Sequence, residues 1–185
     1  KGNKLEYAKA AAHLGSLFAC RGISLVYGGG KVGLMGIIAD SVMAGGRNVL
    51  GVITHKIDRL EVGHTGITKL IKTDGMHARK KLMCSHAEGA IIMPGALGTH
   101  DELFEFATWS QLKEHEDAPE KPCGILNVRG YFDPLLAQIG RMIEDGFLKE
   151  EYRDLILHDI NPEALLAKMD AWIAAHGKTE NPAVA

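Results

Sequence analysis

The sequence is poor in cysteine and in long apolar runs, and each scarcity argues against a class of protein. Its three cysteines, Cys20, Cys84 and Cys123, lie far apart without a CxxC pair, which argues against a disulfide scaffold or a zinc site. The nine histidines show no HExxH or other metal-ligand spacing. No apolar run approaches the roughly 20 residues of a membrane-spanning helix, and no signal peptide is recognisable. We therefore expect a reduced, cytoplasmic chain with no metal, no cofactor and no membrane partner.

The chain also lacks an excess of charge of either sign. Its formal net charge is −2 and its pI is about 6.5, which argues against a general nucleic-acid partner. With 185 residues, 46% of them hydrophobic, the chain is long enough for one substantial core and is not a disordered protein. We expect a single domain over 1–176 and a frayed tail over 177–185.

Short apolar runs alternate with segments of helical periodicity along the chain. The expected strands are 23–27, 48–53, 67–72, 90–93 and 124–128, and the expected helices are 5–20, 34–44, 75–86, 99–113, 131–145 and 162–175. Short, continuous apolar strands between helices are typical of an α/β fold with a parallel sheet that helices cover on both faces. Such a sheet usually starts with a strand, whereas this chain opens in a helix, so we expect the first strand to be missing from this sequence.

What the chain does have is a pair of glycine-rich turns, each between an apolar run and a helical segment. The first is Tyr27-Gly28-Gly29-Gly30-Lys31-Val32-Gly33-Leu34-Met35-Gly36. At a helix N-terminus the backbone N–H groups are unpaired and the helix dipole is positive, so such a turn can hold a phosphate. Its glycines match the dinucleotide pattern GxGxxG, but 49–55 holds no acidic residue for a ribose, and no Gly-Lys-Ser/Thr ends it as in a Walker A loop. An ordinary strand-to-helix turn is the alternative.

The second turn is Pro94-Gly95-Ala96-Leu97-Gly98-Thr99-His100-Asp101-Glu102. As a capping box, Thr99 would accept a hydrogen bond from the third helical N–H, and Glu102 would reach back to the cap. As a second phosphate turn, the segment would place the Glu102 carboxylate at a helix mouth, facing a ligand. The capping interpretation is the stronger from this segment alone, and the two are compatible.

Between the turns lies the basic segment Met76-His77-Ala78-Arg79-Lys80-Lys81. A run of charge is usually a solvated helix face. Arg79 is the best ligand candidate, because the guanidinium fork matches a phosphate or a carboxylate. His77, Phe106 and Trp109 are interpreted as structural, although the two aromatic residues could also line a pocket. Two phosphate turns with a basic segment between them predict a phosphorylated small molecule as ligand, and no serine or cysteine lies in a nucleophile elbow.

Three blocks of this sequence resemble the LONELY GUY (LOG) family of cytokinin-activating phosphoribohydrolases, long labelled possible lysine decarboxylases. The blocks are Tyr27-Gly28-Gly29-Gly30-x-Val32-Gly33-Leu34-Met35-Gly36, Met76-His77-x-Arg79-Lys80 and Pro94-Gly95-x-x-Gly98-Thr99-x-x-Glu102. The resemblance runs from about Tyr7 to Leu166. It implies a Rossmann-like parallel sheet flanked by helices, and a homodimer with active sites near the subunit interface.

The resemblance also implies a reaction, the hydrolysis of the N-glycosidic bond of a cytokinin riboside 5′-monophosphate, or of AMP, to free base and ribose 5-phosphate. Arg79 and Glu102 match the family's catalytic pair. The other implied substrate contacts are Gly29, Gly30, Gly33, Met35, Glu61, Lys80, Gly95, Ala96, Leu97, Gly98, Thr99, His100, Asp101 and Thr108. Bond cleavage builds positive charge on the sugar, which a carboxylate beneath C1′ would stabilise while it orients or deprotonates water.

The sequence departs from the family pattern at two places, and one other function stays open. Ala96 stands where the family has a glycine, which would cost roughly 1 kcal/mol if the position needs φ > 0. The family's first strand ends in a Cys-Gly-Ser-type loop at the nucleotide site, and nothing before Lys1 supplies it. A non-catalytic nucleotide or molybdenum-cofactor carrier on the same fold is the alternative, and the joint presence of Arg79 and Glu102 argues against it. A pyridoxal-dependent lysine decarboxylase is rejected, because no segment offers a Schiff-base lysine with a pyridinium partner.

Overall fold

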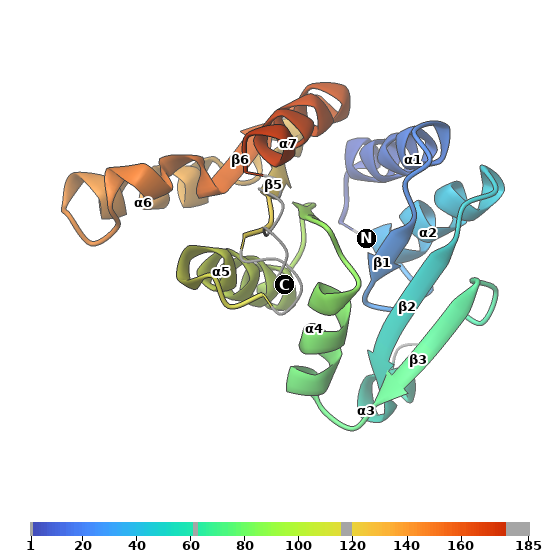
Figure 1. Cartoon of the computed structure of the whole chain (residues 1–185). Coiled ribbons are helices and arrows are strands. Elements are labelled where there is room, and N and C mark those ends of the chain that lie inside the picture. The colour runs from blue at the N-terminus through green and yellow to red at the C-terminus, as the bar shows by residue number, and fades with distance from the viewer. Residues whose placement is uncertain (1, 61–62, 116–119, 177–185) are drawn as a thin grey trace, which may run out of the picture.

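The computed structural model describes residues 2–60, 63–115 and 120–176, in which strands alternate with helices (Figure 1). The strands are β1 Leu25–Tyr27, β2 Val49–Thr54, β3 Lys69–Thr73, β4 Ala90–Ile92, β5 Cys123–Leu126 and β6 Ile156–Asp159. The α-helices are α1 Leu5–Cys20, α2 Leu34–Ala44, α3 His55–Asp58, α4 Met76–Ser85, α5 Leu97–Leu112, α6 Asp133–Glu144 and α7 Pro162–His176. The 3₁₀ turns η1 Val128–Gly130 and η2 Glu150–Leu155 flank α6. The expected tail over 177–185 lies outside the described residues.

The described strands form two three-stranded parallel sheets, ordered β1-β2-β3 and β4-β5-β6. Alternate residues of a strand point to opposite faces of its sheet. Ile91 and Leu126 accordingly pack with α1, α2 and α7, whereas Ile92 and Ile125 pack with α5 and α6. The larger of these two cores also takes in Leu25 of β1, so it spans both sheets and joins them in one domain. The expected α/β fold, with a parallel arrangement and helices on both faces, is confirmed.

Both glycine turns lie at the carboxyl ends of strands, where each opens a helix. The segment 28–33 joins β1 to α2, and 93–96 joins β4 to α5. α4, which carries the basic segment, likewise begins after the carboxyl end of β3. Ligands of open parallel sheets bind at the carboxyl ends of the strands, so the topology puts all three sequence blocks where a site is expected.

The predicted boundaries of the long helices agree with the structure to within two residues, whereas several short or polar elements are missed. α1 and α2 begin and end at the predicted residues. The sequence does not predict β6, because only two of its four residues are apolar; it is a strand through its pairing with β5, where Ile125 lies opposite His158. The short helix α3 and the 3₁₀ turns are likewise absent from the prediction.

α1 and α2 approach each other closely at a glycine. A Cβ on Gly15 would lie 2.6 Å from the Ser41 Cβ and 2.8 Å from the Ile38 carbonyl oxygen, both in α2. Cβ atoms essentially never come so close to a neighbour, so this packing requires a residue without a side chain. Gly140, in α6, is the opposite case, because a Cβ there would meet no atom within 4 Å.

These two helical glycines form a matched pair for a stability test. Gly140→Ala is expected to raise the free energy of unfolding by about 0.5–1 kcal/mol, because alanine loses less backbone entropy in a helix. Gly15→Ala has the same helix preference, yet it is expected to lower that free energy by about 1–3 kcal/mol through overpacking against α2. Urea denaturation measures both changes, and equal effects of the two substitutions would contradict the close approach of α1 and α2.

Candidate active site

The side chain of Arg79 is the centre of the site. It extends from α4 and is only 7% exposed. Its Nε donates a hydrogen bond to the Val52 carbonyl oxygen of β2 at 2.9 Å, and its Nη1 donates to the Glu102 Oε1 of α5 at 2.7 Å. β1 pairs with β2 only as far as Gly51, and the carbonyl of the next residue, Val52, is the one that Arg79 uses. The predicted catalytic pair is therefore brought into direct contact.

Arg79 also lies against the first glycine turn. A Cβ on Gly28 would overlap the guanidinium and would come within 3.3 Å of the Met35 sulfur. A side chain here would displace the guanidinium from its present place, so Gly28 shapes the site, although the predicted site residues do not include it. Its signal is the first glycine of the GxGxxG pattern. Through Gly28 on one side and Glu102 on the other, Arg79 touches both predicted phosphate turns.

The first turn is fixed from outside by the segment 63–66. His64 N–H donates to the Gly29 carbonyl at 2.9 Å, and Gly30 forms an antiparallel bridge with Gly63. The His64 ring accepts a hydrogen bond from Gly66 N–H at Nδ1, so its proton sits on Nε2, which donates to Asp40 of α2 at 2.9 Å. Sequence reasoning gave no signal for this support. Glu61, a predicted substrate contact, lies outside the described residues.

Gly33 ends the first turn as the N-cap residue of α2, with φ of 79°. This left-handed conformation favours glycine, and it turns the chain into the helix. The neighbouring Lys31 and Val32 are exposed, so the backbone of the turn is open to a ligand. Gly29 and Gly30, by contrast, are buried, and Gly29 packs closely on Val52 and Ile53 of β2.

The second turn differs from its predicted form in two ways. α5 begins at Leu97, with Ala96 as N-cap residue and no side-chain cap, so Thr99 already lies inside the helix and the capping box is wrong. Thr99 N–H and His100 N–H instead both donate to the Ala96 carbonyl, at 3.0 and 3.4 Å. Ala96 has φ of −95°, an ordinary extended conformation, so the position does not need φ > 0 and the conditional cost of alanine does not arise.

The backbone N–H groups of 96–98 have no hydrogen-bond partner among the described residues, and these three residues are exposed. They are therefore free to bind an anion at the positive end of the α5 dipole. Gly95, Leu97 and Gly98 thus contribute backbone to this turn. The His100 ring folds back to the Ala96 carbonyl, with 3.0 Å from Nδ1 to the oxygen.

Carboxylates outnumber cations beside the Arg79–Glu102 pair. The Lys80 ammonium binds Asp101 at 3.1 Å and Glu105 at 2.5 Å. Burial alone would lower the pKa of Lys80, but the hydrogen bonds to Glu105 and Asp101 outweigh it and hold that pKa above its ordinary value. Lys80 is therefore charged and already paired. Glu105, which the site prediction omits, completes a group of three carboxylates and two cations, which favours a positive ligand atom over a phosphate here.

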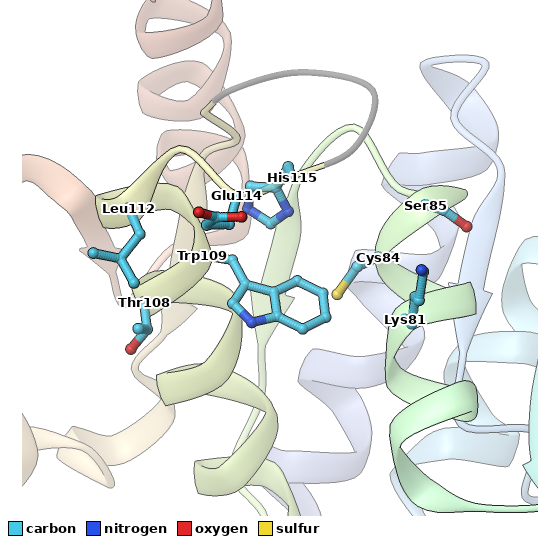
Figure 2. Close-up of a pocket in the computed structure, with 8 residues that line it drawn as sticks. All are labelled: Lys81, Cys84, Ser85, Thr108, Trp109, Leu112, Glu114 and His115. Atoms are coloured by element: carbon cyan, nitrogen blue, oxygen red, sulfur yellow. The ribbon is translucent and has the colours of Figure 1, made fainter.

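A trough between α4 and α5 continues from this acidic group. One hollow of about 440 Å³ is lined by Lys80, Asp101, Phe104, Glu105, Thr108 and Trp109. A second of about 450 Å³ is lined by Lys81, Cys84, Ser85, Thr108, Trp109, Leu112, Glu114 and His115 (Figure 2). Thr108 and Trp109 belong to both, so the hollows adjoin. In Figure 2 the Trp109 indole projects from α5 toward Cys84 and Lys81 of α4. Phe106 is a core residue as expected, whereas Trp109 lines a pocket.

The described part of the chain contains no group of three or more His, Cys, Asp or Glu side chains placed to hold a metal ion. None of the helices found there has both the length and the apolar character to cross a membrane.

The fold and the site place the chain in the class of Rossmann-like α/β proteins with glycine turns at the strand ends. The sequence model of the family described as "Possible lysine decarboxylase" matches residues 35–169. LOGL1 of Oryza sativa subsp. japonica, named "Probable cytokinin riboside 5′-monophosphate phosphoribohydrolase", is 42% identical over 175 residues, which cover 95% of this chain and 77% of that one. LOG1 of Arabidopsis thaliana, named "Cytokinin riboside 5′-monophosphate phosphoribohydrolase", is 39% identical over 177 residues, or 96% and 81% of the two chains. The chain belongs to the LOG family, and the resemblance seen in its motifs is confirmed.

A solved structure of another protein shares the fold. The molybdenum cofactor binding protein from the phototrophic bacterium Rippkaea orientalis superposes with a TM-score of 0.67, covering 92% of this chain and 90% of that one. The two sequences are 19% identical, so the likeness concerns the fold alone.

The cysteines near the trough are expected to be unreactive. Burial raises the pKa of the Cys84 thiol to about 11 and that of Cys123 to about 12, whereas Cys20 is exposed. Because the thiolate is the nucleophile, these two thiols, whose pKa is raised, are expected to stay protonated and unreactive at neutral pH. Iodoacetamide at neutral pH should alkylate Cys20 alone in the folded protein and all three cysteines after denaturation, as followed by mass spectrometry. Rapid labelling of Cys84 in the folded protein would contradict this.

Proposed function

We propose that this protein hydrolyses the N-glycosidic bond of a cytokinin riboside 5′-monophosphate, or of AMP, to release the free base and ribose 5-phosphate. The observation that carries the proposal is the Glu102 carboxylate, held at 2.7 Å by the buried Arg79 between two glycine turns. The names of the curated relatives support the substrate class. A carrier needs the turns but has no use for a fixed carboxylate at the sugar.

The charges of the site suit the reaction. The phosphate would lie on the unpaired N–H groups of 96–98 and on the first turn, away from the carboxylates. As the bond from C1′ to the base breaks, positive charge builds on the ribose, and the neighbouring Glu102 stabilises it. Water attacks C1′ while the bonding electrons leave with the base. Glu102 takes the proton of the water, which passes on to the departing base.

Arg79 prepares Glu102 for this role. Its Nε is held by β2 and its Nη1 by the carboxylate, so the carboxylate is fixed in position and direction. Its remaining guanidinium N–H donors lie beside Gly28, where they can bind the ribose hydroxyls or the phosphate. Asp101 is the adjacent residue on the helix and points to Lys80 instead, so it is not the catalytic carboxylate.

The base would extend along α5 into the trough. Trp109 lies seven residues beyond Glu102, which is about 10 Å along the helix axis. That is close to the reach of an adenine with an apolar substituent on its amino group. Lys80 and Thr108, both predicted substrate contacts, border the same trough, whose far end holds the apolar Trp109, Leu112 and Cys84. We therefore propose that this end receives the substituent.

The proposal includes a homodimer that acts in the cytoplasm. α5 carries large apolar side chains that face solvent beside the trough: Leu97 is 88% exposed, Phe104 39% and Leu112 61%. A row of this kind next to a site is typical of an interface. The free cysteines, spread over the chain, suit a reducing compartment.

The catalytic carboxylate is tested by Glu102→Gln, which keeps the size and polarity of the side chain. Release of base from isopentenyladenosine 5′-monophosphate and from AMP is followed by chromatography. We expect kcat to fall by roughly 10²–10⁴-fold, because the positive charge on the sugar is no longer stabilised by a carboxylate and the proton of the water has no acceptor. Asp101→Asn, the control on the neighbouring carboxylate, should affect KM more than kcat. Tight nucleotide binding without base release by the wild type would identify a carrier instead.

The place of the base is tested by Trp109→Ala. The ratio of kcat/KM for the isopentenyl substrate to kcat/KM for AMP is expected to fall roughly tenfold or more, because an apolar substituent loses its contact. This ratio does not depend on the fraction of enzyme that is folded. Trp172→Ala is the matched control, since that indole stacks on His176 of α7. An unchanged ratio in Trp109→Ala would contradict the proposal that the substituent binds in the trough.

A further inference from the structure

We propose that Tyr131 is a positioning residue of the phosphate site, which it serves by fixing the peptide plane between Gly95 and Ala96. The inference rests on the proposed function, in that it assumes a phosphate on the second turn. Its starting observation is a hydrogen bond of 2.5 Å from the Tyr131 hydroxyl to the Gly95 carbonyl oxygen. The two residues are 36 positions apart, and no sequence motif links them.

The hydrogen bond determines the direction of a backbone donor. A peptide unit is planar and trans, so its C=O and its N–H point in opposite directions. No cis peptide bond occurs among the described residues. When Tyr131 holds the Gly95 carbonyl, the Ala96 N–H of the same plane is turned away from the tyrosine. This N–H is one of the three on 96–98 that have no partner in the described structure.

The peptide plane between Gly95 and Ala96 needs such a support, because within the described residues the Tyr131 hydroxyl makes the only hydrogen bond to it. Ala96, Leu97 and Gly98 are exposed, and Gly95 has no side chain of its own. A Cβ at Gly95 would overlap the Thr99 hydroxyl, so the close fold of the turn depends on glycine here. Glycine leaves the peptide plane free to rotate at low cost. An external donor on the carbonyl removes that freedom before a ligand arrives.

Tyr131 is itself held firmly in place. It follows η1, in which Arg129 adopts φ of 59°. The Asn127 side chain locks this turn: its Oδ1 accepts from Phe132 N–H at 2.8 Å, and its Nδ2 donates to Asp133 at 2.7 Å. The Tyr131 ring makes edge contacts with Phe132 at 4.9 Å and with Tyr7 at 6.1 Å between centroids. The hydrogen bond from Tyr131 to Gly95 therefore ties the second turn to the segment that joins β5 to α6.

Removal of the hydroxyl should weaken binding of the phosphate specifically. Tyr131→Phe keeps the ring contacts and deletes only the donor. The affinities for AMP and for ribose 5-phosphate, measured by calorimetry, are expected to fall roughly tenfold, as for one hydrogen bond to a charged group. The affinity for adenosine, which has no phosphate, should stay unchanged. In turnover, KM for AMP should rise by a similar factor while kcat changes less than twofold.

Tyr7→Phe is the matched control, because its ring touches Tyr131 and its hydroxyl makes no hydrogen bond within the described residues. It should leave all three affinities unchanged. Equal weakening of adenosine and AMP in Tyr131→Phe would reduce Tyr131 to a general structural residue and overturn the inference, as would unchanged affinities. The binding arms do not need hydrolysis. If the wild type releases no base, yet Tyr131→Phe loses affinity for ribose 5-phosphate, the hydrolase proposal fails and the inference stands.

Discussion

The buried guanidinium of Arg79 is the group on which the geometry of the site depends. A charge removed from water must be met by hydrogen bonds from the protein, and the Val52 carbonyl and Glu102 supply them. The first partner belongs to the sheet and the second to α5. The position of the Glu102 carboxylate is thereby tied to the backbone of β2 and not only to its own flexible side chain. Loss of the Glu102 carboxylate would leave an uncompensated buried charge, at a cost of about 3–5 kcal/mol.

The charges around this arginine are separated along the direction in which a nucleotide would lie. The exposed N–H groups of 96–98 and the dipole of α5 make one end positive. At the other end, three carboxylates outnumber two cations and make that end negative: the carboxylates are Asp101, Glu102 and Glu105, and the cations are Arg79 and Lys80. A nucleoside monophosphate carries a negative phosphate and, during cleavage, a positive sugar, so one ligand can satisfy both ends. This separation comes from ordinary elements, a helix terminus and side chains one turn apart on α5.

Sequence patterns predicted much of this arrangement, because the long helices have clear periodicity and the three motif blocks are local. They located Arg79 and Glu102 but could not give the distance between them, which depends on how α4 and α5 pack. The capping box failed for a physical reason: the Ala96 carbonyl accepts two N–H groups, so the helix starts before Thr99. Glu105 and Tyr131 were not predicted, because their contacts with Lys80 and with the Gly95 carbonyl form only in the folded chain. β6 was not predicted, because its pairing with β5, and not its own composition, makes it a strand.

The absence of a side chain at Gly28 has a consequence for how the sequence can vary. The Arg79 guanidinium occupies the space that a Cβ at position 28 would fill, so the two residues share one volume. Any larger residue at 28 requires a shorter or differently placed side chain at 79. Substitutions at positions 28 and 79 are therefore expected to depend on each other. A lineage, or a mutant library, that introduces a larger residue at 28 therefore has to move the arginine side chain as well.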